Sequence, residues 1–458
     1  MFRRILIANR GEIALRIIRA CRELGVEAVC VFSEADRGAP YLDLADRAIC
    51  IGPGPARESY LNTARVIAAA EVASVDAIHP GYGFLAERAD FAEMCRDCNF
   101  EFIGPSPEAM SKLGDKIEAK KYARAAKVPV FPGSEEAIDD AEEAIELAKE
   151  IGFPVIIKAA AGGGGRGMRI CRSDGELREN VKKAQQEAEA AFGNGAVFVE
   201  KFLEDARHVE VQVLGDKHGH AVHLFERDCS LQRRHQKVVE EAPGPGIERK
   251  KVEEVCKGAA RLIKSAGYSG AATVEFLMDR NQDFYMLEVN TRVQVEHPVT
   301  EMITGIDIVQ ASIRLAAGEP LWFKQRDVKV TGHAMECRIN AEDPARNFMP
   351  SPGRIGEYAS PGGPGVRVDS HARAGYLVPP TYDSMIGKLI THGATRDACM
   401  DRMARSLDEY VIEPLKTTIP LQRRMMDDPG FRSGGVDIHY LERLLKEQTP
   451  AAASATER

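Results

Sequence analysis

The 458-residue sequence lacks any apolar run long enough to span a membrane as a helix, which takes about 20 residues. It also lacks a signal peptide, because only a few apolar residues separate Phe2-Arg3-Arg4 from Asn9-Arg10. We therefore expect a cytoplasmic protein. Basic residues are not in excess, and the net charge of −8 disfavours a nucleic-acid partner.

A disulfide or zinc framework is missing as well. Ten cysteines are spread along the chain, and the C-x-x-C pair of Cys95 and Cys98 has no second pair at zinc spacing. We predict that both are reduced thiols on a helix. An internal repeat and the Gly-Lys-Ser/Thr ending of a Walker loop are also absent.

What is present is typical of a soluble globular protein: 44% hydrophobic and 28% charged residues, at a length that predicts about three domains. A strand at 5–8, a helix at 12–24 and a strand at 27–32 form a βαβ opening, which indicates a parallel α/β domain. The turn between the first two elements has one glycine, Gly11. We therefore expect a Rossmann-like scaffold without NAD, and an NAD oxidoreductase is disfavoured.

A glycine-rich loop follows a short apolar strand at Val155–Ile157. Lys158 ends the strand, and Gly162–Gly167 contains five glycines and one arginine. Glycine backbones can bring several N–H groups close to a phosphate. The next residues, Met168–Arg172, alternate like a strand, so we predict a hairpin whose loop covers phosphates as a mobile lid. The alternative is a flexible linker.

The residues around this loop predict a compact unit at 135–203. Helices are expected at 140–151 and 174–192, and a strand at Val197–Glu200. The Pro- and Gly-containing stretch Val128–Ser134 is predicted to be the joint before it. Lys201–Leu203 could act as a hinge whose backbone reads a base edge, although Leu203 could equally be core.

A hairpin with strands at 272–278 and 284–290 predicts a metal site. If its loop is Arg280–Asp283, Glu275 lies opposite Glu288, and two facing carboxylates repel each other unless a cation lies between them. Asn290 shares the face of Glu288. Oxygen ligands beside a phosphate loop indicate Mg²⁺ bridging ATP. The alternative is a solvent-facing strand with the two glutamates splayed apart.

The same alternation is predicted to continue through Thr291–Pro298. It would place Arg292, Gln294 and Glu296 on the face of Glu288 and Asn290, a polar column that suits a site. Two further segments stay open on residue grounds: the charge run at 226–237, which could be a solvated face, and the turn at 79–84, which could be a plain loop or border a site.

Taken in order, these segments resemble biotin carboxylase, of the ATP-grasp superfamily, over essentially the whole chain except the tail. The motifs that carry the resemblance are 7–14, 79–85, 162–167, 226–241, 288–298 and 336–344. The resemblance implies an α/β protein with a Rossmann-like N-terminal domain at 1–113, an ATP-grasp domain at 114–330 with a lid at about 131–203, and a C-terminal domain of mixed α/β structure at 331–447. We expect 448–458 to be a disordered tail.

The resemblance also implies a reaction: ATP, bicarbonate and biotin on a carrier protein give ADP, phosphate and carboxybiotin by way of carboxyphosphate. The implied ATP-binding residues are Lys116, Lys158, Gly162, Gly163, Gly164, Gly165, Arg166, Gly167, Glu200, Lys201, Phe202, Leu203, His208, Gln232, His235, Glu275 and Glu288. The implied metal ligands, for Mg²⁺ or Mn²⁺ and two ions in number, are Glu275, Glu288 and Asn290. The implied bicarbonate-binding residues are Lys237, Arg292, Gln294 and Val295. The implied catalytic residues are Arg292, Glu296 as base, Lys237 and Arg338. The implied biotin-binding residues are Arg338, which stabilises the biotin enolate, and Tyr82.

Partners follow from the resemblance too. Biotinylated carriers hold their lysine in Ala-Met-Lys-Met, whereas the nearest sequence here, Ala334-Met335-Glu336-Cys337, has no lysine. We therefore expect biotin on a separate carrier protein and carboxyl transfer by other subunits. Family members are usually homodimers, and Arg16, Arg19 and Glu23 lie on the helix used for that contact. The rival functions are another ATP-grasp ligase, such as a carboxylate–amine ligase, and a non-catalytic nucleotide-sensing subunit.

Overall fold

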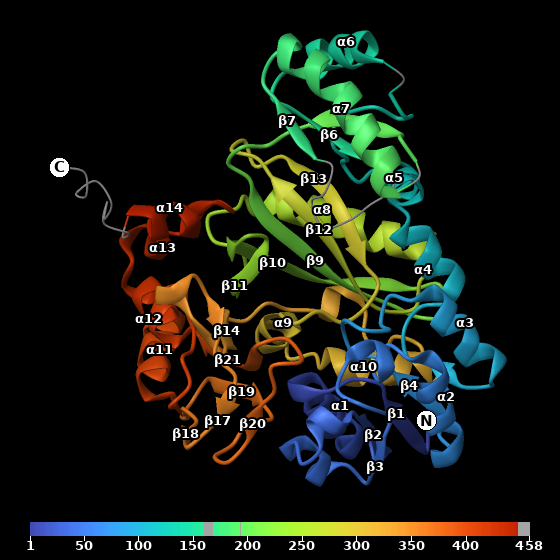
Figure 1. Cartoon of the computed structure of the whole chain (residues 1–458), viewed down its shortest axis with the longest axis vertical. Coiled ribbons are helices and arrows are strands. Elements are labelled where there is room, and N and C mark those ends of the chain that lie inside the picture. The colour runs from blue at the N-terminus through green and yellow to red at the C-terminus, as the bar shows by residue number, and fades with distance from the viewer. Residues whose placement is uncertain (139, 160–167, 193, 448–458) are drawn as a thin grey trace. The chain divides into compact units, whose positions relative to one another are not determined.

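In the computed structural model, the residues described are 1–138, 140–159, 168–192 and 194–447, without the side chains of 116, 117, 191 and 192. Contacts divide the chain into two compact units. The larger unit comprises Met1–Val128, Arg207–Phe276 and Glu288–Arg458, and the smaller comprises Pro129–Ala206 and Leu277–Leu287. Figure 1 labels the elements of both units.

The larger unit opens with a parallel sheet in the order β3-β2-β1-β4-β5. Its elements in chain order are β1 (Arg4–Ile7), α1 (Gly11–Glu23), β2 (Glu27–Phe32), β3 (Arg47–Cys50), α2 (Thr63–Ala73), β4 (Ala77–His79), α3 (Ala89–Asp97), β5 (Glu101–Phe102), α4 (Pro107–Gly114) and α5 (Lys116–Ala125). Ile5, Leu6 and Ile7 are all fully buried, as expected for a strand covered on both faces. The predicted parallel α/β opening is confirmed.

A second, eight-stranded sheet has the order β13-β12-β9-β10-β11-β14-β21-β19. Its strands are β9 (Arg207–Gly215), β10 (Ala221–Arg233), β11 (Gln236–Ala242), β12 (Gly270–Met278), β13 (Phe284–Asn290), β14 (His333–Asn340), β19 (Val366–Ser370) and β21 (Met385–Gly393). Strand pairs from β9 through β19 are antiparallel. The helices between these strands are α8 (Arg249–Ser265), α9 (His297–Thr304) and α10 (Ile308–Ala316). The tip of the β12–β13 hairpin counts with the smaller unit.

Short strands and four helices complete the C-terminal part. The strands are β15 (Glu342–Asp343), β16 (Met349–Pro350), β17 (Gly353–Arg354), β18 (Glu357–Ala359), β20 (Leu377–Val378) and β22 (Val411–Glu413), and the helices are α11 (Arg396–Glu409), α12 (Ile419–Asp427), α13 (Pro429–Ser433) and α14 (Tyr440–Glu447). Short 3₁₀ helices lie at Glu34–Asp36, Pro40–Leu44, Ala56–Glu58, Gln325–Asp327 and Pro344–Arg346.

The smaller unit is a three-stranded sheet with two helices. The antiparallel order is β7-β6-β8, with β6 at Val155–Ala159, β7 at Arg169–Cys171 and β8 at Val197–Lys201. Helices α6 (Ala141–Ile151) and α7 (Asp174–Phe192) share one apolar core with these strands. The predicted pairing of the two strands that flank the glycine loop is confirmed. The loop itself, 160–167, lies outside the described residues, as does the predicted tail, 448–458.

The strand predicted for Thr291–Pro298 is wrong. Strand β13 ends at Asn290, an irregular segment follows, and α9 begins at His297. Pro298 lies in the first turn of α9, where its ring favours helical backbone angles and its missing N–H costs no hydrogen bond. The period-two reasoning about Arg292, Gln294 and Glu296 therefore does not hold, although all three still belong to the site described below.

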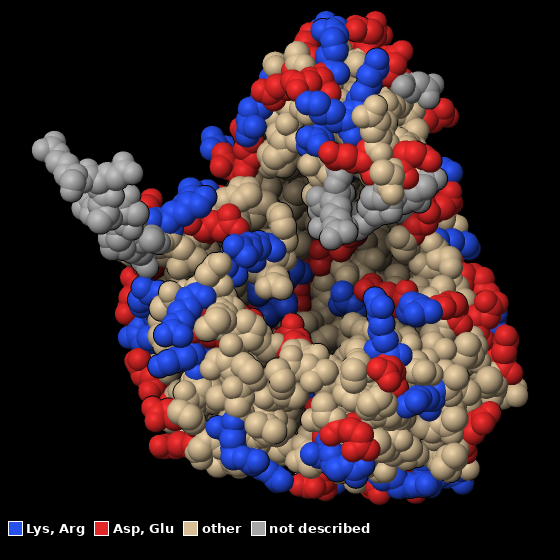
Figure 2. All heavy atoms as spheres, viewed as in Figure 1, with Lys and Arg blue, Asp and Glu red and all other residues tan. Residues whose placement is uncertain are grey.

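The cysteines are reduced, and the surface visible in Figure 2 carries charges of both signs, as the sequence predicts. Cys95 lies in α3, Cys98 caps its C-terminus, and all ten cysteines are free thiols. On the face that Figure 2 shows, Lys and Arg are interspersed with Asp and Glu. Among the described residues, none of the helices combines the length and apolarity that a membrane span needs.

Candidate active site

A buried lysine of the larger unit lies among three carboxylates. Lys237 Nζ, on β11, is 2.5 Å from Glu296 Oε1, 2.6 Å from Glu210 Oε2 and 3.1 Å from Glu275 Oε1. The lysine side chain is 13% exposed, and Glu210 is fully buried. The structure thus brings together three residues predicted from the sequence, Lys237, Glu275 and Glu296, by charge-assisted hydrogen bonds around one nitrogen.

Arg227 is fully buried and donates hydrogen bonds to residues of this cluster. It lies on β10 directly opposite Glu210 of β9, and its Nε donates to Glu210 Oε1 at 2.6 Å. Its Nη2 donates to Gln294 Oε1 at 2.7 Å. Gln212, Thr273 and Thr300 accept its remaining hydrogen bonds. Sequence reasoning gave Arg227 no role, because a cation inside a dense charge run looks the same whether it is buried or solvated.

The electrostatics of the cluster keep its acids ionised. Burial alone would raise the pKa of Glu275, but Lys237 and His208 bring that pKa below its ordinary value. Burial also opposes ionisation of Glu296, yet Lys237, Arg338 and Arg227 lower its pKa overall. The pKa of Lys237 is raised well above normal, because the carboxylates outweigh the effect of burial. All three residues are therefore charged at neutral pH.

Glu296 connects Lys237 to a second cation. It immediately precedes α9, and its Oε2 accepts a hydrogen bond from Arg338 Nη2 at 3.0 Å. Arg338 belongs to β14, and its Nε donates to Glu240 Oε1 at 2.5 Å. A carboxylate that is 2% exposed and bonded to a cation on each side can neither rotate freely nor exchange readily with solvent.

Gln294 and Val295 are held by backbone and amide contacts beside this carboxylate. The Gln294 amide donates to Glu275 Oε1 at 2.7 Å. The Val295 carbonyl accepts from Lys388 Nζ at 2.8 Å, and Lys388 is itself fully buried on β21. Sequence reasoning also missed Lys388, which lies about 90 residues downstream of the segment it contacts.

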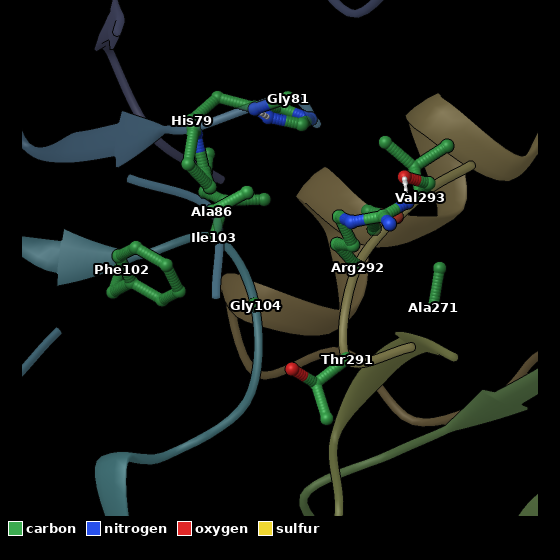
Figure 3. A pocket seen from close by; sticks show the side chains of 12 residues that line it. His79, Gly81, Ala86, Phe102, Ile103, Gly104, Ala271, Thr291, Arg292 and Val293 are labelled. Carbon is green, nitrogen blue, oxygen red and sulfur yellow. Dashed lines mark hydrogen bonds between the residues drawn. The ribbon is translucent and has the colours of Figure 1, made fainter. Parts of the chain in front are cut away.

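Arg292 lies at one side of the cluster, not at its centre. Its Nε donates to Glu87 Oε2 at 2.9 Å, and its Nη2 donates to Asn290 Oδ1 at 2.8 Å. Asn290 in turn donates to Glu275 Oε1 at 2.9 Å. Figure 3 shows Arg292 in a pocket where its guanidinium also bonds the Val293 carbonyl at 3.4 Å. The other pocket residues come from the segments 79–86, 102–104 and 271, together with Thr291 and Ser312.

The predicted metal ligands differ in exposure. Glu275 and Asn290 are buried, whereas Glu288 is exposed. A hydrogen bond from Asp279 N to Asp283 O closes the turn of the hairpin. Asp283 therefore pairs with Asp279 across the hairpin and does not lie in the loop. The predicted loop, Arg280–Asp283, on which the pairing of Glu275 with Glu288 depended, does not have the right bounds. Glu275 and Asn290 are buried next to each other, and carboxylate and amide oxygens are ligand types suited to Mg²⁺. Ligand atoms of His208, Glu210 and Glu275 also lie within 4.8 Å of one another.

Two of the predicted nucleotide residues form a half-buried ion pair in the smaller unit. Lys158 Nζ, on β6, is 2.6 Å from Glu200 Oε2 on β8, and it lies 5.6 Å from the centre of the Phe131 ring. Lys201 is anchored beside this pair, since its Nζ donates to the carbonyls of Gly152 and Phe153 at 3.0 and 2.9 Å. Phe202 N donates to the Pro154 carbonyl at 3.0 Å, and Leu203 follows in an irregular segment.

The remaining predicted residues are spread over the larger unit. Gln232 is buried on β10 and donates to the Cys229 carbonyl at 3.2 Å. His235 is exposed in the two-residue turn between β10 and β11, where both Arg234 and His235 have positive φ, +48° and +64°. Residues other than glycine rarely adopt this backbone conformation, and such backbone strain is found at functional sites. The Tyr82 hydroxyl donates to Glu12.

Three family models match the chain in order. They are "Biotin carboxylase, N-terminal domain" at 1–110, "Carbamoyl-phosphate synthase L chain, ATP binding domain" at 115–324, and "Biotin carboxylase C-terminal domain" at 336–443. The chain is 56% identical over 446 residues to Biotin carboxylase of Haemophilus influenzae, covering 97% of this chain and 99% of that one.

Solved structures of similar proteins cover the chain equally well. The biotin carboxylase-beta-gamma-ATP complex from Campylobacter jejuni has a TM-score of 0.91 at 50% identity, covering 97% of this chain and 99% of that one. The biotin carboxylase domain dimer of Hydrogenobacter thermophilus 2-oxoglutarate carboxylase, in complex with MgADP, ADP and bicarbonate, has a TM-score of 0.89 at 48% identity, covering 97% and 98%.

Proposed function

Because this chain belongs to the biotin carboxylase family of enzymes, we propose that it carboxylates biotin on a separate biotin carboxyl carrier protein. ATP and bicarbonate are the other substrates, and ADP and phosphate are released. The observation that carries the proposal is the buried carboxylate of Glu296 between two cations, Lys237 and Arg338. An ionised, fixed acid beside two cationic donors can accept a proton from an anion that those donors bind.

Glu296 is the proposed general base. Bicarbonate must lose a proton as it attacks the γ-phosphorus of ATP to give carboxyphosphate. The charges around Glu296 keep it ionised, which makes it free to accept a proton but also a weaker base. Lys237 and Arg292 would bind bicarbonate with Gln294 and the Val295 backbone, and their positive charge makes the bound bicarbonate more acidic, which offsets that weakness.

The proposed ATP residues lie in both units. In the smaller unit they are Lys158, the loop at 162–167 and 200–203; in the larger unit they are Lys116, His208, Gln232, His235, Glu275 and Glu288. Two solved relatives support ATP and Mg²⁺, since one is a biotin carboxylase-beta-gamma-ATP complex and the other is a complex with MgADP, ADP and bicarbonate. Glu275, Glu288 and Asn290 would hold Mg²⁺ or Mn²⁺, up to two ions, which would neutralise the charge of the phosphates.

Arg338 and Tyr82 are proposed to contact biotin. Once Nε and Nη2 of Arg338 are bonded to Glu240 and Glu296, its Nη1 donates to none of the described residues. That nitrogen is available for the ureido oxygen of biotin, where negative charge develops when the ring is deprotonated.

The partners are a carrier protein and carboxyltransferase subunits. We place the chain in an acetyl-CoA carboxylase, and thus at the start of fatty acid biosynthesis. The alternative is a carboxylase for pyruvate, another 2-oxo acid or another acyl-CoA, and the 2-oxoglutarate carboxylase relative supports keeping it. A homodimer through α1 is also proposed. In the structure Arg16 is bonded to Glu301 and Asp307 of its own chain, whereas Arg19 and Glu23 are exposed.

The test is Glu296→Gln, which keeps the size of the side chain but cannot accept the proton. We expect ATP to bind normally, while ADP release that depends on bicarbonate and biotin falls about 10²–10⁴-fold. Glu301→Gln is the matched control, because it makes the same change at a buried glutamate on α9 that is bonded to Arg16 and Arg367 instead. Turnover of Glu296→Gln within a few-fold of wild type would exclude the base role. ADP release without any requirement for bicarbonate and biotin would favour another ATP-grasp ligase.

A further inference from the structure

Two glutamates face each other beside Arg338 on the large sheet. Glu240 of β11 is directly opposite Glu336 of β14. Arg338 is two residues from Glu336, and Lys388 of β21 is directly opposite Arg338. Opposite residues of antiparallel strands, and residues two apart on one strand, point to the same face of a sheet. The four side chains therefore form one charged patch.

The two glutamates are buried but poorly supplied with hydrogen-bond donors. Both are fully buried. Neither oxygen of Glu336 has a hydrogen-bond partner among the described residues, and the same holds for Oε2 of Glu240. The nearby cations are engaged elsewhere: Arg338 bonds Glu240 Oε1 and Glu296, and Lys388 bonds the Val295 carbonyl and lies 3.2 Å from Glu12.

Two ionised carboxylates could not remain in this position. Side by side they would repel each other, and a buried ionised carboxylate without donors is costly. One proton between them removes both problems, because a protonated carboxyl group donates where an ionised one accepts. Burial, opposed by Arg338 and Lys237 and assisted by Glu296, raises the pKa of Glu240 to about 7. Burial, opposed by Lys388 and Arg338 and assisted by Glu240 and Glu296, raises that of Glu336 well above normal.

We propose that Glu240 is a positioning residue for Arg338, and that Glu240 and Glu336 share a single proton at slightly alkaline pH, such as pH 8. Glu336 carries this proton and Glu240 stays ionised, because the only donor that reaches either carboxylate from the described residues is Arg338 Nε, at Glu240. The inference rests on the proposed role of Arg338 toward biotin.

The arrangement has a consequence during turnover. When Glu296 accepts the proton of bicarbonate, its carboxylate becomes neutral and its bond to Arg338 weakens. The ionised Glu240 then holds the guanidinium through Nε while Nη1 stays directed to the substrate. While Glu296 is neutral, the proton on Glu336 leaves Glu240 as the negative charge bonded to Arg338, so Glu336 adds no second one.

The test compares three glutamine variants. Glu240→Gln removes the negative charge and should lower biotin-dependent turnover about 10- to 100-fold, as expected for a displaced reacting group, with KM for ATP unchanged. Glu336→Gln replaces a neutral carboxyl group with a neutral amide and should stay within about 3-fold of wild type, because one uncharged hydrogen-bonding group replaces another. Glu241→Gln is the control on the same strand but the opposite face, where Glu241 bonds His333 and Arg396.

The pH profile separates positioning from a purely structural role. In the wild type, turnover should fall as pH decreases through about 7, because Glu240 then takes up a second proton for the pair and Arg338 loses its partner. Glu240→Gln should lose this acid limb and show a low, flat profile, whereas Glu241→Gln should keep it. Equal damage from Glu336→Gln and Glu240→Gln would overturn the shared proton, and a Glu240→Gln enzyme with wild-type turnover and profile would overturn the positioning role.

A measurement on the wild-type protein does not depend on whether Glu240→Gln folds. Infrared spectra at pH 8 should contain the C=O band of a buried protonated carboxyl group, and Glu336→Gln should remove it. If the band is absent from the wild type, the shared proton is excluded. If wild-type ADP release does not depend on bicarbonate and biotin, the proposed function fails, while the infrared band still decides the protonation of the pair.

Discussion

One ion pair from each unit illustrates the two extremes of burial, although the larger unit also contains exposed pairs such as Arg37 with Glu34. In the smaller unit, Arg178 and Glu142 pair at 2.8 Å with side chains 55% and 69% exposed, on the helices α7 and α6. In the larger unit, Arg227 and Glu210 pair at 2.6 Å with both side chains fully buried. Exposed pairs are screened by water and contribute little, whereas buried ones are costly to assemble. The buried cluster therefore indicates chemistry, and the exposed pairs indicate an ordinary surface.

The smaller unit has one instructive contrast of its own. Glu200 is nearly buried while its partner Lys158 is 30% exposed. This pair lies at the strands that flank the predicted phosphate loop, and both residues are proposed to serve ATP. The contrast is thus one between surface charge and site charge, and three experiments can sharpen or break it.

The largest effect is expected for Lys237→Met, which leaves the carboxylates of Glu210, Glu275 and Glu296 without their shared cation. Removing one partner of a buried ion pair typically costs about 3–5 kcal/mol of unfolding free energy. Turnover should also fall, by about 10²–10³-fold, since one donor to the bound anion is lost. Urea unfolding measures the change in unfolding free energy, and an ADP-release assay measures the change in turnover. A stability change below about 1 kcal/mol would show that the cluster tolerates its own charge.

An intermediate effect is expected at His371, a buried polar residue of the larger unit with no assigned role in the cluster. It packs against Tyr41 and Tyr376, and neither ring nitrogen has a partner among the described residues. Burial, assisted by Arg10, lowers its pKa to about 3. Its neutral form contributes full stability above the unfolded pKa of about 6.5, and this is lost as pH falls toward 3, by up to about 1.4 kcal/mol per pH unit.

His371→Phe should therefore flatten the decline of unfolding free energy between pH 6 and pH 5, whatever its effect at pH 8. Urea titrations at a series of pH values measure the slope, and His218→Phe, at an exposed histidine, serves as the matched control. An unchanged slope in His371→Phe would mean that this histidine does not stay neutral in the folded protein.

The smallest effect is expected for the exposed pair Arg178 and Glu142. Replacing either with Ala should change the unfolding free energy by less than about 0.5 kcal/mol, and a double-mutant cycle should give a coupling below about 1 kcal/mol. A coupling as large as that of the buried cluster would break the comparison between the units.

Local pattern predicted much of the fold. The strand at Glu27–Phe32 and the helix at Asp174–Phe192 have the predicted bounds, because their apolar periodicity is strong and tertiary contacts agree with it. The same reasoning failed for Thr291–Pro298, where polar and apolar residues alternate without forming a strand. There α9 begins at His297, so the last residues of the alternating segment are helical and not extended.

The site shows the same division. Lys237, Glu296 and Arg338 were predicted because they lie within long motifs shared with a family, and Glu275 was predicted from the hairpin pattern at 272–290. Glu210 and Lys388 lie outside these motifs, and Arg227 lies inside one of them without an assigned role, because a charged residue has the same letter whether it is solvated or fully buried. Only the pairing of β9 with β10 and of β14 with β21 brings them next to residues of the motifs.

The sequence by itself determined the local elements, the family and the set of residues that could do the chemistry, because these depend on neighbours in the chain. The tertiary structure decided which acid meets which cation. Glu210, Glu275 and Glu296 come from β9, β12 and the segment before α9, yet they meet at one nitrogen of Lys237. It also decided that Glu240 and Glu336 face each other, with three of their four carboxylate oxygens unbonded by any described residue. Charge state depends on burial and on partners far apart in the chain, and no local pattern encodes either.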